Sequence, residues 1–114
     1  MIDNKSISPE ELNLKQGSIF CKLDGKVISI SKRTVLLQAN NREGKIQFIK
    51  DSDNKLKFFY SSLFSNEIKF EYDTALLDSS KSYIYAFTWD ITKKEFTVYL
   101  NGKEIEKFPM SLKK

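Results

Sequence analysis

Apolar and polar residues alternate with a period of two along most of this 114-residue chain. Because successive side chains of a β-strand point to opposite faces, this period is typical of strands. Turn-forming residues separate the alternating segments, which recur about every ten residues. The segments are residues 18–23, 27–30, 34–39, 45–49, 56–61, 67–72, 82–90 and 96–100. Such spacing without long helical periodicity predicts an all-β antiparallel sandwich or barrel.

The stretch from residue 82 to residue 105 carries the strongest strand pattern. One face of its first strand holds Tyr83, Tyr85, Phe87 and Trp89, and the other holds Ile84, Ala86 and Thr88. The return strand directs Phe96, Val98 and Leu100 one way and Thr97 and Tyr99 the other. Asn101-Gly102 then supplies residues that tolerate positive φ in a tight turn. We expect this hairpin to lie at the centre of the fold, with a core formed by Phe87, Trp89, Val98 and Leu100.

The length fits a single domain over residues 1–114, which would bury about two thirds of the surface of the open chain. Residues 1–16 are predicted as an N-terminal lead-in, with a capped turn at 8–11 and a short strand over 12–15. Residues 40–44 are predicted as a loop, 51–54 as a hairpin turn and 75–77 as a brief helical turn. Residues 106–114 are predicted as a tail or an edge strand because they contain Pro109.

Several of these segments are similar to a known family. Tyr-Ala-Phe-Thr-Trp-Asp at residues 85–90 and Phe-Thr-Val-Tyr-Leu-Asn-Gly-Lys at residues 96–103 resemble a strand pair of laminin-G-like and concanavalin-A-like lectin/glucanase domains. Gly-Ser-Ile-Phe at 17–20 and the hairpin around 51–54 resemble the family's early strand and middle hairpin. The resemblance implies a jelly-roll β-sandwich. The family usually has further strands, so the sandwich is incomplete at its edges unless the N-terminal segment and the tail close them.

The resemblance implies a non-catalytic recognition module that binds a glycan or a glycosylated protein, in carbohydrate binding or surface adhesion. Two aromatic rings, Tyr99 and Phe59, lie opposite the expected core faces of their strands. A ring beside polar side chains can stack on a sugar, and Lys57, Gln47 and Thr97 supply those polar groups. The alternative is that both rings only cover the second face of a twisted sheet.

Two other function classes stay open. A structural domain could form homo-oligomers by pairing through an open sheet edge. A degenerate glycoside hydrolase is suggested by Glu67, Lys69 and Glu71, which have the Glu-x-Asp-x-Glu spacing of some related glucanases. Lysine at the central position would hold both carboxylates ionised, whereas a glycosidase needs one of them protonated. Alternating charge on a solvent face explains these residues, and we expect no enzymatic activity.

Metal binding has little support in the residues themselves. Asp51-Ser52-Asp53 opens like a calcium loop, but the sixth position is Leu56 and the twelfth is Ser62, where such loops have Gly and Glu. The absence of histidine and the presence of only one cysteine exclude zinc sites and nucleophilic triads. Calcium binding is suggested only by the family resemblance, because domains of that family often bind calcium through loop oxygens that are scattered in the sequence. The oxygens available here belong to Asn40, Asp73, Asp78 and Asp90.

The distribution of charge and the search for targeting segments limit the classes of partner and the cellular locations that we expect. The net charge of +4 is spread along the chain and is not gathered into a basic stripe, which argues against a nucleic-acid partner. The N-terminus lacks the apolar core of a signal peptide, and no apolar run is long enough to span a membrane. The sequence is therefore expected to belong to an intracellular protein or to a module excised from an extracellular or cell-surface protein.

Overall fold

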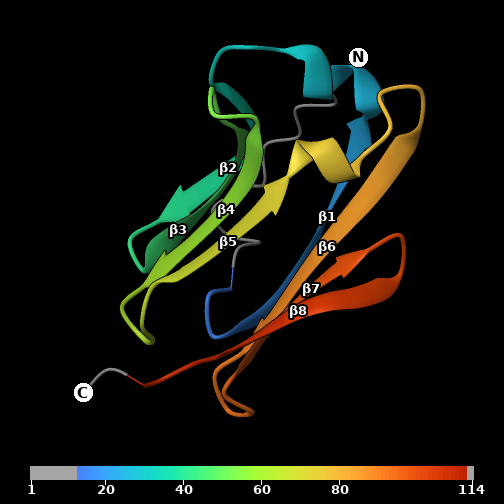
Figure 1. Cartoon of the computed structure of the whole chain (residues 1–114). Helices are drawn as coiled ribbons and strands as arrows, with labels where there is room; N and C mark the ends of the chain where they lie inside the picture. Colours follow the sequence, from blue (N-terminus) through green and yellow to red (C-terminus); the bar gives the residue numbers. More distant parts are fainter. Residues whose placement is uncertain (1–12, 113–114) are drawn as a thin grey trace.

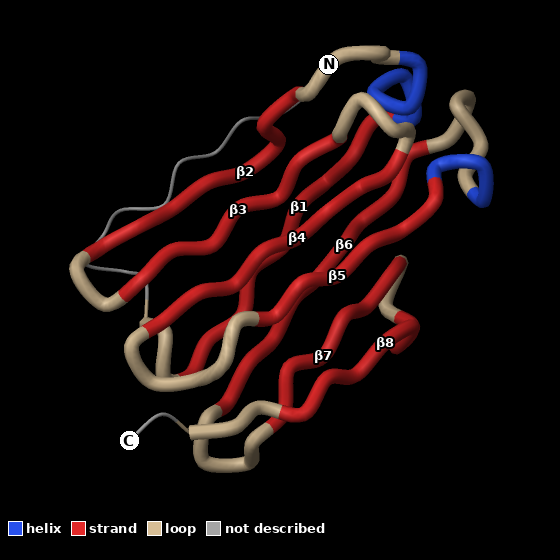
Figure 2. The backbone as a smooth tube through the Cα atoms, turned by 60° about the vertical axis from the view of Figure 1, so that its left-hand side comes forward, coloured by secondary structure: helices blue, strands red, loops and turns tan. Residues whose placement is uncertain are grey.

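The computed structural model describes residues 13–112, and these residues form two four-stranded antiparallel sheets (Figures 1 and 2). The first sheet has the order β1 (Gln16–Asp24), β6 (Ser82–Asp90), β7 (Glu95–Leu100), β8 (Lys103–Pro109). The second has the order β2 (Thr34–Asn41), β3 (Gly44–Lys50), β4 (Lys55–Ser62), β5 (Ile68–Asp73). The prediction of an all-β antiparallel fold is confirmed. Within the described part of the chain, no helix is long and apolar enough to cross a membrane.

The two sheets face each other across a core of aromatic side chains. Phe58 of β4 stacks on Phe87 of β6 with ring centroids 3.8 Å apart, and Phe48 of β3 meets Phe87 edge-on at 5.1 Å. All three are fully buried, and burial of each such side chain contributes roughly 1.5–3 kcal/mol. Contacts between sheets therefore hold the sandwich-like arrangement together.

The hairpin of β6 and β7 is confirmed as predicted. The two strands pair without a register shift, and β7 is followed by a turn in which Asn101 and Gly102 have φ of 52° and 82°. Its predicted core residues Phe87, Trp89 and Val98 are buried, whereas Leu100 is only half-buried because it is the last residue of β7. The edge strand predicted within residues 106–114 is confirmed in part, because β8 begins earlier, at Lys103, and ends at Pro109. Pro109 and the exposed charged residues of β8 disfavour further pairing at this edge.

The strand predicted over residues 27–30 is wrong, because the chain forms the 3₁₀ helix η1 (Gly25–Ser29) there. The Asp24 carboxylate accepts a hydrogen bond from the backbone N–H of Lys26 at 3.0 Å and so caps the helix. Gly25 donates its N–H to the carbonyl of Lys81 at 2.8 Å, and a Cβ there would collide with that oxygen. The brief helical turn predicted at 75–77 is confirmed as η2 (Thr74–Leu76), shifted by one residue.

Two further predictions need correction. The loop predicted over residues 40–44 is shorter, because β2 continues to Asn41 and β3 begins at Gly44. The turn predicted at 8–11 lies outside the described residues. Of the lead-in strand predicted over 12–15, residues 13–15 are not strand, because the Asn13 side chain bends the chain by accepting the N–H of Lys15 at 2.9 Å.

A lysine lies inside the fold at the end of β3. Lys50 is fully buried, and its Nζ donates hydrogen bonds to the carbonyls of Ile30 (2.5 Å) and Asp51 (3.1 Å) and to Oδ1 of Asn54 (3.4 Å). Ile30 follows η1, whereas Asp51 and Asn54 belong to the turn between β3 and β4. One buried ammonium therefore joins two connections that are far apart in the sequence.

Candidate binding surface

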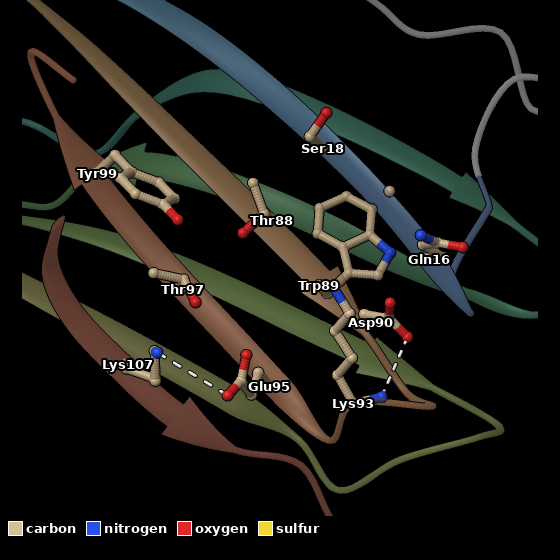
Figure 3. A pocket seen from close by; sticks show the side chains of 11 residues that line it. Gln16, Ser18, Thr88, Trp89, Asp90, Lys93, Glu95, Thr97, Tyr99 and Lys107 are labelled. Atoms are coloured by element: carbon tan, nitrogen blue, oxygen red, sulfur yellow. Dashed lines mark hydrogen bonds and ion pairs between the residues drawn. The ribbon is translucent and has the colours of Figure 1, made fainter. Parts of the chain in front are cut away.

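A cavity of about 430 Å³ lies on the outer face of the sheet β1-β6-β7-β8 (Figure 3). Its floor is a row of direct cross-strand partners, one from each strand: Ser18, Thr88, Thr97 and Lys107. Each of the four directly precedes or follows a residue that is buried in the core or packed against it, so the alternation of side chains along a strand turns it to the outer face. We call this cavity the trough and its first three floor residues the hydroxyl row.

Charged side chains line one end of the trough. Asp90 closes the β6-β7 turn, because its Oδ1 accepts the backbone N–H groups of Thr92 (2.9 Å) and Lys93 (3.2 Å). Lys107 Nζ lies 3.8 Å from the carboxylate of Glu95. Figure 3 marks this ion pair with a dashed line. With two carboxylates and two ammonium groups among its lining residues, the trough carries no net charge.

An aromatic side chain bounds the hydroxyl row on the other side. Tyr99 lines the trough, is half-buried, and lies beside Thr88 and Thr97 (Figure 3). Its cross-strand partner on β6 is Ala86, whose partner on β1 is Phe20. We call Phe20, Ala86 and Tyr99 the apolar row. It runs across the strands beside the hydroxyl row.

The five predicted site residues are divided between the two outer faces of the molecule. Thr97 and Tyr99 share the trough, with Thr97 largely buried in its floor. Gln47 of β3 and Phe59 of β4 are cross-strand partners on the outer face of the other sheet. There the Gln47 amide donates to Gln38 at 2.7 Å, and Lys69 Nζ lies 5.9 Å from the centroid of the Phe59 ring. Only two of the five residues therefore lie in one site.

Lys57, the fifth predicted residue, is the centre of an ion cluster. Its Nζ lies 2.9 Å from the carboxylates of both Asp51 and Asp53 and 3.8 Å from that of Glu71. The hydrogen bonds from Lys57 hold the pKa of each aspartate below its usual value and raise the pKa of Lys57. The two carboxylates that suggested a calcium loop thus bind an ammonium group of the same chain.

Replacing Lys57 by Met is expected to destabilise the protein at neutral pH and to matter much less in acid. The lowered pKa values mean that the aspartates stabilise the fold above pH 3.8 and lose this effect as the pH falls through their folded values. The raised pKa of Lys57 means that its contribution is present below pH 10.5 and is lost only at higher pH. Denaturant midpoints of the wild type and the variant at neutral pH and well below pH 3.8 test this, and an equal difference at the two pH values would contradict it.

Most of the residues considered for catalysis and metal binding make local contacts, and the others are exposed. Lys69 pairs with Glu71 at 3.3 Å, and Glu67 is exposed just before β5. Of the suggested calcium ligands, Asp73 and Asp78 accept backbone N–H groups of nearby residues, Asp90 does so in its turn, and Asn40 is exposed on β2. No group of three or more His, Cys, Asp and Glu side chains within residues 13–112 is placed to hold a metal ion.

Sequence reasoning missed Phe20, which is one of the most exposed large apolar side chains at 69%. The signal was present, because Phe20 alternates with the buried residues Ile19 and Cys21 of the same strand. The alternation along one strand does not show that β1 pairs with β6. This pairing places Phe20 opposite Ala86, and therefore in one row with Tyr99 of β7.

Comparison of the chain with models of protein families, with curated proteins and with solved structures gives no match. The trough and the side chains around it are therefore the basis for assigning a function to this protein.

Proposed function

We propose that this protein is a non-catalytic recognition module that binds carbohydrate in the trough. The observation that carries the proposal is the placement of the Tyr99 ring beside the hydroxyl row on one outer sheet face. A sugar ring has an apolar face of C–H groups and a polar edge of hydroxyls. An aromatic ring next to serine and threonine hydroxyls complements both.

The chemistry of the hydroxyl row suits a sugar better than an ion. Each serine or threonine hydroxyl both donates and accepts hydrogen bonds, as each sugar hydroxyl does. A site for an ion needs an excess of protein charge opposite to that of the ion. In the trough, the two carboxylates and the two ammonium groups balance each other. Binding of a neutral polyhydroxylated ligand is therefore favoured over binding of a phosphate or a metal ion.

The family resemblance supports the same function. The sequences at residues 85–90 and 96–103 are similar to strands of laminin-G-like and concanavalin-A-like lectin domains. They lie in β6, in β7 and in the turn that follows β7, and β6 and β7 are the two central strands beneath the trough. We propose a jelly-roll sandwich of that kind, with the trough on its ligand-binding face.

Tyr99→Ala is expected to weaken glycan binding about tenfold, since a stacked ring contributes up to roughly 1.5 kcal/mol. A glycan array would identify the ligand, and isothermal titration calorimetry would measure its affinity for each variant. Tyr99→Phe keeps the ring and should bind nearly as well as the wild type.

Phe59→Ala is the matched control, because it removes a half-buried ring from the other sheet. It should leave affinity unchanged. Absence of binding to every glycan at millimolar concentration would refute the proposal, and an equal loss in Tyr99→Ala and Phe59→Ala would refute the assignment to the trough.

A further inference from the structure

We propose that the ligand of the trough is a neutral, linear oligosaccharide that crosses the strands and stacks on two rings, Tyr99 and Phe20. The inference rests on the proposed function and adds to it the length, direction and charge of the ligand.

The pairing of the strands places the two rings on one face. Phe20 is opposite Ala86 in the β1-β6 pair, and Ala86 is opposite Tyr99 in the β6-β7 pair. Neighbouring strands are about 4.8 Å apart, so the two ring-bearing positions are separated by roughly 9–10 Å across the sheet. Ala86, which lies between the two ring-bearing positions, has a small side chain that does not project from the sheet between the rings. One sugar ring cannot stack on both side chains at this separation, whereas successive units of a chain can.

Exposure marks Phe20 as a contact residue. It is 69% exposed in the middle of β1, and Ile84, next to Ala86 on the same face of β6, is 47% exposed. Such apolar side chains on a sheet face next to a cavity are typical of a surface that binds a partner. In the second sheet, by contrast, the outward ring of Phe59 is half-buried and lies under Lys69.

The two rows determine the direction of the ligand. The hydroxyl row and the apolar row both run from β1 over β6 to β7, two residues apart along each strand. A ligand that fits both rows has an apolar face and a hydroxyl-bearing edge that continue over several units. A linear sugar chain lying across the strands has this form.

The charges around the trough select a neutral chain. Asp90 and Glu95 are balanced by Lys93 and Lys107, and Glu95 and Lys107 lie within 3.8 Å of each other. A sulfated or uronic-acid polymer would need an excess of lysine here, as attraction between opposite charges across an interface requires.

The test is a titration of the wild-type protein with neutral oligomers of increasing length, from one to six sugar units. The probes are β-1,4-linked glucose, α-1,4-linked glucose and β-1,4-linked N-acetylglucosamine. The wild type should bind the tetramer about three- to tenfold more tightly than the monomer of the same sugar, the gain expected of a second stacked ring. Phe20→Ala should lose this gain and keep its affinity for the monomer, whereas Tyr99→Ala should lose affinity for both.

Leu76→Ala is the matched control, because Leu76 is also 69% exposed but lies on η2, and it should behave like the wild type. If none of these oligomers binds but another glycan on the array does, this inference alone is overturned, whereas if no glycan binds at all, the proposed function fails and this inference fails with it. If sugars bind without any dependence on length, or if Phe20→Ala keeps the dependence, only the two-ring inference is overturned. Tighter binding of a sulfated or uronic-acid oligomer would overturn the assignment of a neutral ligand.

Discussion

Replacing Phe87 by Ala is expected to lower the free energy of unfolding by about 3–5 kcal/mol. Phe87 is fully buried, stacks on Phe58 at 3.8 Å and meets Phe48 and Phe70 edge-on at 5.1 and 6.2 Å. Removing its ring leaves a cavity between the sheets, which the surrounding rigid strands cannot close. Denaturant unfolding followed by the fluorescence of Trp89, the single tryptophan, would measure the loss.

Two further variants make this measurement decisive. Phe87→Leu retains most of the volume and should stay folded with a loss of less than about 1.5 kcal/mol, even if Phe87→Ala does not fold. Phe20→Ala removes the same ring from an exposed position and should change stability by less than about 0.5 kcal/mol. Equal stability of Phe87→Ala and Phe20→Ala would show that the two sheets do not pack as described.

Replacing Lys50 by Met is expected to cost about 2–3 kcal/mol, because three oxygens lose their common donor at roughly 1 kcal/mol each. Lys50→Glu should prevent folding, since it would place a carboxylate against those oxygens in a buried site. Thermal and denaturant unfolding would measure both effects. The control is Lys45→Met, an exposed position on the same strand, which should change little. Equal effects of Lys45→Met and Lys50→Met would contradict the structural role of Lys50.

The alternation of side chains predicted the strands well where a strand is long. Both strands of the hairpin at residues 82–100 appear as predicted. Over segments of this length the alternation with a period of two is long enough to be distinguished from the helical period of about 3.6. The four residues Val27–Ile30 satisfied the same pattern and are mostly helical. The deciding contact joins Gly25 to the carbonyl of Lys81, far along the chain, and no local pattern contains it. The burial of Lys50 was hidden for the same reason, since one of its acceptors is Ile30.

The candidate site was predictable only in part. Alternation shows which side chains of a strand point away from the core, and it correctly gave this orientation for Tyr99, Gln47 and Phe59. It does not show which sheet a strand joins. Tyr99 and Phe59 therefore appeared to be equivalent candidates, although the order of the strands places them on opposite outer faces. The same missing information concealed the partnership of Phe20 with Tyr99.

The central strand β6 has a consequence for how such a protein can diverge. Phe87 fills the core, and its neighbour Thr88 lines the trough, so adjacent residues belong separately to the core and to the outer surface. Substitutions at Thr88, and at Ser18 beside it on β1, can alter the surface without opening a cavity in the core. Under the proposed function, related chains could therefore acquire a different ligand through single substitutions, without first gaining extra stability.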